Sequence, residues 1–203
     1  MSVTRLLVLG AVRIFQPAHG YLVRRELVSW QAEEWAHLNP GSVYNALRSL
    51  TRDGMLAEES AEPGGPDGPG AAKVRYRLTD DGETEFGRLV RVALWQLHPY
   101  QPEWLLAGMS FWSALSRQEV LDALAARRTQ LDGRILATGY AAESIRQTPF
   151  KPEAVVEHFL LHAEQLRGEL AWVDAVTERL RSGEYWFDGE PGHEIPALSE
   201  VNI

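Results

Sequence analysis

The sequence contains no cysteine among its 203 residues. This absence excludes a disulfide framework, a thiol nucleophile and a cysteine-based zinc site. A long hydrophobic run is missing as well. The apolar N-terminal stretch from Leu6 to Val12 is far too short to span a bilayer, and Arg13 and Phe15 follow it where a signal peptide would carry small residues. We therefore expect a cytoplasmic protein.

The chain also lacks net positive charge. Its formal charge of −8 argues against indiscriminate binding of nucleic acid over the whole surface. The charge is uneven, however, because residues 1–82 carry 9 Lys and Arg against 10 Asp and Glu, whereas residues 83–203 carry 11 against 18. A local basic face can therefore form only in the first part of the chain.

Residue patterns that indicate catalysis are absent too. No Gly-rich phosphate loop follows a strand, and no nucleophile stands with a base and an orienting group. His158 and His162 are one helical turn apart, a spacing that metal ions use, but Phe159 stands where a zinc protease carries glutamate. These histidines are better explained as flanking a helix interface. We expect no enzymatic activity, no cofactor and no metal site.

What the sequence does contain is a regular order of short elements. The apolar spacing predicts helices over residues 4–15, 19–30, 40–52 and 80–97, with strands over 56–60 and 73–78. In the second strand Val74, Tyr76 and Leu78 alternate with Lys73, Arg75 and Arg77. The Gly- and Pro-rich segment 62–70 between the strands is predicted to be a long hairpin tip.

The helix predicted at residues 40–52 has two unlike sides. Asn39 is a suitable N-cap, Pro40 suits the first helical position, and Gly54 suits the left-handed residue after the end. One side carries Val43, Ala46, Leu47 and Leu50, and the other carries Ser42, Asn45, Arg48, Ser49 and Arg52. The polar side is either simply solvated or a binding face, and this helix alone does not decide between the two.

The rest of the chain is predicted to be helical. Two long helices, 117–147 and 153–181, are joined by a turn at 148–152 and should form an antiparallel hairpin. The second carries an apolar seam close to a heptad repeat. We expect this seam to form a dimer interface that includes Phe159, Leu166, Leu170 and Val173, because a symmetric partner would cover it.

Three stretches together resemble a known family. HGYLVRREL at 19–27, PGSVYNALRSLTRDGML at 40–56 and RYRLTDDG at 75–82 are similar, in order and spacing, to the PadR-type bacterial transcriptional regulators. The resemblance covers about residues 1–95. The remainder is similar in architecture to the C-terminal dimerisation domain of longer PadR members.

The resemblance implies a mostly α fold: an N-terminal winged helix-turn-helix followed by a C-terminal helical, coiled-coil-like hairpin that dimerises. The expected domains are a DNA-binding domain at 1–95, a dimerisation domain at 99–182 and a tail at 183–203. The helix at 40–52 would be the recognition helix and the two strands the wing. The candidate DNA-binding residues are Ser42, Tyr44, Asn45, Arg48, Ser49, Arg52, Lys73, Arg75 and Arg77.

Some members of this set have a second explanation. Tyr44 is equally consistent with a half-buried packing residue, and Gly20 and Tyr21 are better explained by packing and by the start of a helix. The long tip, with Asp67, and the nearby Glu58 and Glu59 should repel phosphate. Wing contacts are therefore expected from Lys73 and Arg75 above all.

Tryptophan is abundant, with seven residues. Trp95, Trp104 and Trp112 fall where the two predicted domains meet. Indoles in such places are usually packed core, but in the family that this chain resembles, small aromatic or cationic molecules often bind in the same region. These three residues are therefore candidates for an effector pocket.

We thus expect a homodimeric DNA-binding regulator, ligand-responsive and a repressor, with a pseudo-palindromic double-stranded DNA operator as its partner. The competing hypothesis is a protein-interaction module in which the acidic helices bind a partner and the winged helix does not bind DNA. Operator binding distinguishes the two.

Overall fold

The computed structural model describes residues 2–60, 74–98 and 100–190. Its elements are α1 (Val3–Phe15), β1 (Ala18–His19), α2 (Gly20–Ser29), α3 (Ala32–Trp35), α4 (Pro40–Arg52), β2 (Leu56–Ser60), β3 (Val74–Leu78), α5 (Asp80–Trp95), α6 (Glu103–Met109), a 3-10 turn (Trp112–Ala114), α7 (Arg117–Arg146) and α8 (Glu153–Arg181). The described chain forms two compact units, divided after Val90, with residues 101–112 returning to the first unit. Among the described residues, no helix combines the length and apolar character that a membrane crossing needs.

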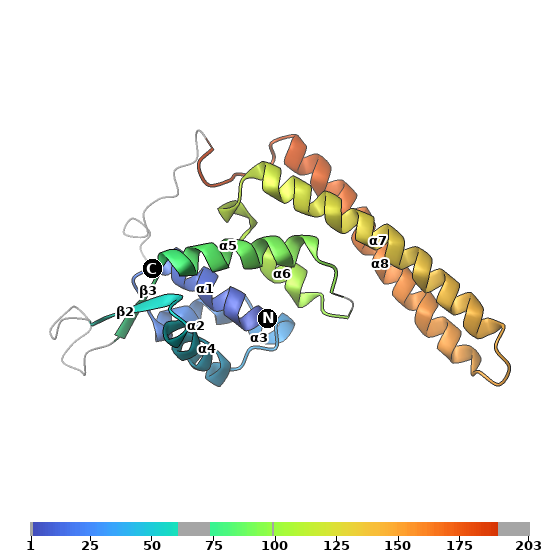
Figure 1. The fold of residues 1–203 in the computed structure, drawn as a ribbon, viewed down its shortest axis with the longest axis horizontal. Helices are drawn as coiled ribbons and strands as arrows, with labels where there is room; N and C mark the ends of the chain where they lie inside the picture. Colours follow the sequence, from blue (N-terminus) through green and yellow to red (C-terminus); the bar gives the residue numbers. More distant parts are fainter. Residues whose placement is uncertain (1, 61–73, 99, 191–203) are drawn as a thin grey trace. The chain divides into compact units, whose positions relative to one another are not determined.

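The first unit is built around α1 (Figure 1). Residues Leu6 to Val12 are all buried, which is why this helix is apolar on every side. Helices α2, α4 and α6 all contact it. Gly10 admits the ring of Phe111, since a β-carbon at Gly10 would lie 2.2 Å from Phe111 Cζ. Phe111 also packs edge-to-face on Phe86, at 5.5 Å between ring centroids.

The wing is a three-stranded antiparallel sheet in the order β1-β3-β2. In β2 and β3, Leu56 faces Leu78 and Glu59 faces Arg75, so the two strands predicted from sequence pair as a hairpin. The two-residue strand β1 was not predicted. It pairs His19 with Arg75, and it is too short to show a period-two pattern.

The predicted winged helix-turn-helix fold is confirmed, with one addition. A four-residue helix, α3, precedes the recognition helix, so the helix predicted as third in the chain is the fourth, α4. Left-handed residues bound α3 on both sides, Gln31 with φ 56° and His37 with φ 51°. Neither is a glycine, and four residues are too few for a helical period, so the sequence carried no sign of this turn.

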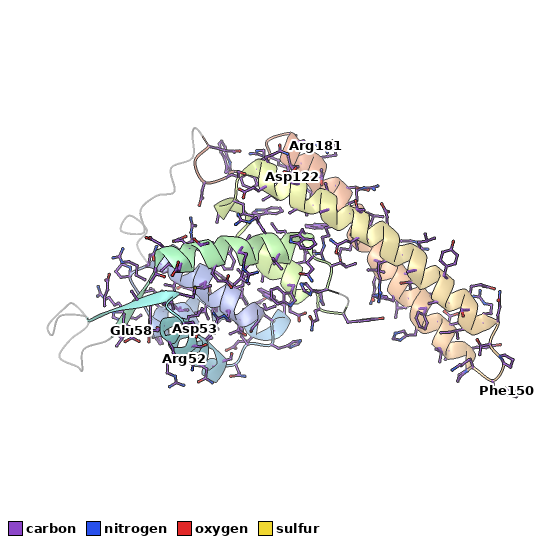
Figure 2. The ribbon with its side chains drawn as sticks, viewed as in Figure 1. Arg52, Asp53, Glu58, Asp122, Phe150 and Arg181 are labelled. Carbon is purple, nitrogen blue, oxygen red and sulfur yellow. The ribbon has the colours of Figure 1, made fainter. Side chains whose placement is uncertain are left out.

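The second unit contains the predicted helical hairpin. Helices α7 and α8 lie side by side and antiparallel (Figure 1). Ser116 and Glu119 form a capping box at the start of α7, and Arg128 of α7 pairs with Asp174 of α8 at 2.8 Å. Phe150 lies in the turn at the end of the hairpin and points away from both helices (Figure 2). Its side chain is fully exposed.

Two arginines anchor further segments on this hairpin. Arg127 is buried, donates to Glu169 at 2.6 Å, and donates to the carbonyls of Leu94 and Gln96 at the end of α5. Arg117 donates to the carbonyls of Leu180 and Tyr185 and to Glu190. Its guanidinium also lies 4.8 Å from the centre of the buried Phe187 ring. The residues after α8 are thereby held against α7.

The compact units divide the chain differently from the predicted domains. Residues 101–112, expected in the dimerisation domain from 99 onwards, belong to the first unit, because Phe111 fills the space over Gly10 and α6 contacts α1. Helix α5 ends at Trp95, two residues before the predicted Leu97. As functional domains, 1–95, 99–182 and 183–203 stay a prediction, and the described residues end at 190.

Candidate nucleic-acid interface

Helix α4 is fixed at both ends by its own sequence. At its start, Ser42 N–H donates to Asn39 Oδ1 at 2.8 Å, and Asn39 N–H donates to Ser42 Oγ at 3.2 Å. At its end, Met55 N–H donates to the Leu50 carbonyl and Gly54 N–H to the Thr51 carbonyl, with Gly54 at φ 77°. This is a complete Schellman motif. Both helix ends are therefore defined, and the exposed side chains are presented from a rigid segment.

The two sides of α4 separate as the spacing predicted. Val43, Ala46, Leu47 and Leu50 are buried, and α4 contacts both α1 and α2. Gly41, Asn45, Arg48 and Arg52 are exposed at intervals of four, three and four residues, so they form one stripe along the helix. We call these four residues the α4 stripe. Figure 2 shows Arg52 and Asp53 at the end of this helix.

The polar contacts on this side leave the two arginines largely available. Arg48 donates to the neutral amide oxygen of Asn45. Arg52 donates to Ser49 Oγ at 3.3 Å and lies 3.6 Å from the Asp53 carboxylate, with a side chain that is 78% exposed. No carboxylate occurs between residues 35 and 52. The stripe therefore carries positive charge with little to neutralise it.

Asp53, the C-cap of α4, is held from the other side. Arg5 of α1 donates to Asp53 Oδ2 at 2.7 Å and to Ser49 Oγ at 3.3 Å. The hydrogen bond from Arg5 is the main cause that lowers the pKa of Asp53 below its ordinary value. Ser42 and Ser49, both predicted as DNA contacts, are thus engaged within the protein, Ser42 in the cap and Ser49 beneath Arg5.

The wing offers less free charge than its sequence suggested. Arg77 donates to Glu59 Oε1 at 2.8 Å, so its charge is balanced across the hairpin. Arg75 donates through Nε to His19 Nε2 at 3.1 Å, and His19 Nδ1 lies 3.2 Å from the Val74 carbonyl. The two contacts together need a neutral ring with its proton on Nδ1. Lys73 lies outside the described residues.

Tyr76 is a wing residue that the sequence analysis did not single out. It is half-buried beside Glu58, Arg48 and Tyr44, and burial, followed by the charge of Glu58, raises the pKa of its phenol. Its hydroxyl therefore keeps its proton at neutral pH and can donate a hydrogen bond. Tyr44 is 41% exposed and its ring approaches Gly20, so it is both a packing residue and accessible.

Arg24 of α2 is a second residue that the sequence analysis missed. It lines a shallow hollow beside the start of α4, together with Asn39, Pro40 and Val43, and Glu33 also borders this hollow. Arg24 Nε is buried without a hydrogen-bond partner among the described residues. A guanidinium beside a helix N-terminus favours an anion. The only sequence sign was the pair Arg24-Arg25 in a stretch that otherwise indicated packing.

The residues predicted for other sites differ in burial. Trp104 is buried, Trp112 is half-buried and Trp95 is 40% exposed. As ligand-binding residues they stay a prediction. In α8, Leu166 and Val173 are buried and Phe159 and Leu170 are half-buried. As a dimer interface these four stay a prediction, and two of them are already covered within one chain.

The two histidines of α8 lie under an aromatic ring. Tyr100 stacks on His162 with 4.5 Å between ring centroids, and His158 lies 6.5 Å from the same ring. His162 is buried, and in the part of the chain that the structure describes neither of its ring nitrogens has a hydrogen-bond partner. The pair thus borders a packed contact.

A helix-turn-helix with a β-hairpin wing and an exposed polar stripe on its last helix defines the winged-helix class. Residues 8–88 match the model of the PadR-like family of transcriptional regulators. Through this domain the chain belongs to that family, and in class it is a DNA-binding transcriptional regulator. The resemblance inferred from three short motifs is thereby confirmed.

Several solved structures are also similar to the chain. Bacillus subtilis PadR in complex with operator DNA is 19% identical, with 88% of this chain and 99% of that chain covered and a TM-score of 0.38. The same protein with p-coumaric acid is 18% identical over the same shares, at 0.36. A PadR-like regulator from Bacillus cereus is 18% identical, with 89% and 99% covered, at 0.35. Scores this low support no inference about this chain. No curated protein sequence matches it.

Proposed function

We propose that the protein is a homodimeric, cytoplasmic, ligand-responsive transcriptional repressor that binds a pseudo-palindromic DNA operator through two copies of α4. The observation that carries this proposal is the α4 stripe. It places Asn45, Arg48 and Arg52 along one exposed side of a helix whose other side is buried and whose two ends are capped. A solvated surface needs neither this order nor the absence of carboxylates.

The chemistry of the stripe suits the edges of base pairs. An α-helix fits the major groove, where arginine makes bidentate contacts with guanine and asparagine with adenine. Arg48 and Asn45 are bonded to each other in the free protein, so both must turn towards the bases on binding. Because the partner of Arg48 is a neutral amide, this exchange separates no ion pair.

Contacts to phosphate would hold the helix in register. Arg24 and the N–H groups at the start of α4 offer one anchor, and Tyr44 and Tyr76 offer hydroxyl donors beside the stripe. On the wing, Arg75 is the candidate, because Arg77 is balanced by Glu59 and Glu58 adds negative charge. The wing contribution should therefore be small.

The homodimer is proposed from the surface of the hairpin. Leu136 and Tyr140 of α7 and Leu160 and Leu161 of α8 are exposed although they are large and apolar. A second copy covering these side chains would bury them in a two-fold symmetric interface. Such a dimer presents two α4 helices, and half-sites about 34 Å apart, or a multiple of this spacing, would match its symmetry.

Repression needs only occupancy of the operator, because a bound dimer excludes polymerase without further contacts. Control by a ligand would then act on the geometry of the dimer, since a molecule shifts an equilibrium only by its differential affinity for the two states. Trp95, Trp104 and Trp112 are the candidates from sequence for that ligand's contacts. The proposed activity contains no catalytic step.

The test is a selection of duplexes from a random pool by the purified full-length protein, with its oligomeric state measured by sedimentation. The proposal expects an enriched site with two-fold symmetry and a dimer at micromolar concentration. A pool without enrichment, with the acidic hairpin capturing a protein partner instead, would favour the alternative of a protein-interaction module. A monomer at micromolar concentration would contradict the dimer.

A further inference from the structure

The first unit carries an open apolar hollow away from the α4 stripe. Its volume is about 440 Å³, and it is lined by Trp30, Trp35, Leu106, Met109 and Ser110. The two indoles come from the end of α2 and from α3, and the other three residues come from α6 and the residue after it. None of the three tryptophans predicted to bind a ligand lines it. This is the size range of small-molecule sites, which are mostly apolar.

The walls of the hollow are fixed before any ligand arrives. Trp35 Nε1 donates to the Trp30 carbonyl at 3.0 Å, so the polar atom of that indole is already satisfied. Trp30 packs edge-to-face on the buried Phe111, at 5.8 Å between ring centroids. Ser110 Oγ donates to the Leu106 carbonyl at 2.9 Å. The hollow therefore offers indole faces and a thioether and no free side-chain donor of its own.

The charges beside the hollow favour a cation. Residues 26–47 include Glu26, Glu33 and Glu34 and no Lys or Arg, and residues 92–116 include Glu103 and no Lys or Arg. Both wall segments thus belong to stretches of negative charge only. Indole faces attract cations, and methionine adapts to flat aromatic surfaces. An aromatic carboxylate would meet repulsion here, whereas a flat aromatic cation meets complementary charge.

The hollow also lies on the segment that leads into the recognition helix. Trp35 is the last residue of α3, and the left-handed residues Gln31 and His37 bound that helix. Asn39, the N-cap of α4, follows His37 by two residues. Residues held in the left-handed region are sites where a small rotation changes the chain direction. A molecule that moves Trp35 would therefore move the start of α4.

We infer that this hollow binds a flat aromatic cation and that the bound molecule acts on DNA binding through α3. The binding step is independent of the proposed function, and the action on DNA rests on it. The probe is rhodamine 6G, a cationic xanthene dye, with the anionic xanthene dye fluorescein as the charge control. Binding of each to the full-length protein is followed by fluorescence anisotropy.

The expected result is saturable binding of one rhodamine 6G per chain, with fluorescein weaker by about tenfold or more. Trp35→Ala should weaken rhodamine by about tenfold, whereas Trp186→Ala, at an exposed indole of the second unit, should leave it unchanged. Binding of neither dye, or equal binding of both, would overturn the inference. Loss of dye binding as the protein concentration is raised would show that a second copy occupies the hollow instead.

A matched pair of variants keeps the test valid if Trp35→Ala fails to fold. Leu106 is 38% exposed at the edge of the hollow, so it tolerates a charged side chain. Leu106→Lys and Leu106→Glu remove the same apolar area but add opposite charges. The inference expects Leu106→Lys to bind rhodamine 6G at least about tenfold more weakly than Leu106→Glu. Equal weakening by both would mean that charge plays no part and would overturn the choice of a cation.

The action on DNA is measured with the duplex selected by the wild-type protein. Saturating rhodamine 6G should change duplex affinity for the wild type and not for Trp35→Ala, which controls for dye that binds DNA directly. Dye binding without any change in duplex affinity would overturn the link through α3. If the protein binds no duplex when dye is absent, the proposed function fails while the binding site stands.

Discussion

The helices α4 and α8 treat their arginines in opposite ways. On α8, Arg167 pairs with Glu164 and Arg181 with Glu178, each on its own surface. On α4, Arg48 is bonded to the neutral Asn45, and Arg52 is 78% exposed. Paired charges on a solvated surface contribute little to stability and attract no polyanion. The comparison teaches that basic residues on a helix indicate nucleic-acid binding only where their neighbours leave the charge uncompensated.

The two helices also differ in how they are held. Helix α4 has side-chain and backbone motifs at both ends, and Arg5 bonds to its C-cap. Helix α8 has no side-chain N-cap, and its position depends on contacts with α7 along its length. Order in α4 is therefore local, and order in α8 is long-range. Each prediction below breaks or sharpens this contrast.

The largest effect is expected from burying a charge in the hairpin. Leu166 is 4% exposed and Leu161 is 62% exposed on the same helix. Leu166→Glu should lower the free energy of unfolding by at least about 3 kcal/mol, because a carboxylate replaces packed hydrocarbon. Urea unfolding followed by circular dichroism measures it.

Leu161→Glu is the matched variant. It should keep the stability of one folded chain and shift the protein from dimer towards monomer in sedimentation, since this side chain belongs to the proposed interface. Equal stability of the two variants would contradict the assigned burial. A dimer unaffected by Leu161→Glu would place the interface elsewhere.

The next effect separates a crowded glycine from an uncrowded one. Gly10→Ala would place a β-carbon 2.2 Å from Phe111 Cζ and should cost about 1–3 kcal/mol through overpacking. Gly133→Ala, in α7, meets no atom within 4 Å and should instead stabilise by about 0.5–1 kcal/mol. Thermal unfolding of both variants against wild type provides the measurement. A neutral Gly10→Ala would mean that Phe111 moves aside freely.

A smaller effect is expected for phosphate contacts. Arg24→Gln and Arg75→Ala should each weaken binding to every duplex by roughly 1 kcal/mol, and each should lower the slope of log affinity against log salt by about 0.9. Arg134→Ala, at an exposed arginine of α7, is the control and should change neither quantity. A variant that lost preference for one base while keeping its salt slope would show a base contact instead.

The smallest effect concerns pH. The pKa of Asp53 is lowered, chiefly by the hydrogen bond from Arg5, so its contribution to stability is complete above the ordinary value of 3.8 and is lost as pH falls through the lower value of the folded state. Asp53→Asn should therefore be less stable than wild type at pH 7 and equal to it in strong acid. Glu190, held by Arg117, should follow the same rule in the second unit. A difference that persisted in strong acid would show that packing, not charge, is lost.

The contrast also explains what the sequence could predict. The bounds of α4 were predictable because Asn39, Pro40 and Gly54 act on their immediate neighbours. The hairpin was predictable from its long apolar spacing. Arg24 and Tyr76 were not, because their importance depends on residues far apart in the chain, Asn39 for Arg24 and Arg48 for Tyr76. The same holds for the balance of Arg77 by Glu59, which needs the register of β2 and β3.

Burial within the hairpin was the hardest feature to predict. The seam of α8 indicated which residues are covered, but it could not tell cover by α7 from cover by a second chain. Leu166 and Val173 are covered by their own hairpin, whereas Leu161, outside the seam, is exposed. A heptad pattern specifies an apolar side and not the identity of its partner.

The central claim is that Arg48 reads a base from the α4 stripe, and one measurement tests it most directly. It is a double-mutant cycle on the duplex recovered by selection, pairing Arg48→Ala with replacement of each guanine in the half-site. At one guanine, Arg48→Ala should cost about 1–3 kcal/mol with the original duplex and almost nothing once that guanine is replaced. An equal cost with every duplex would contradict the claim, because it would make Arg48 a contact to phosphate.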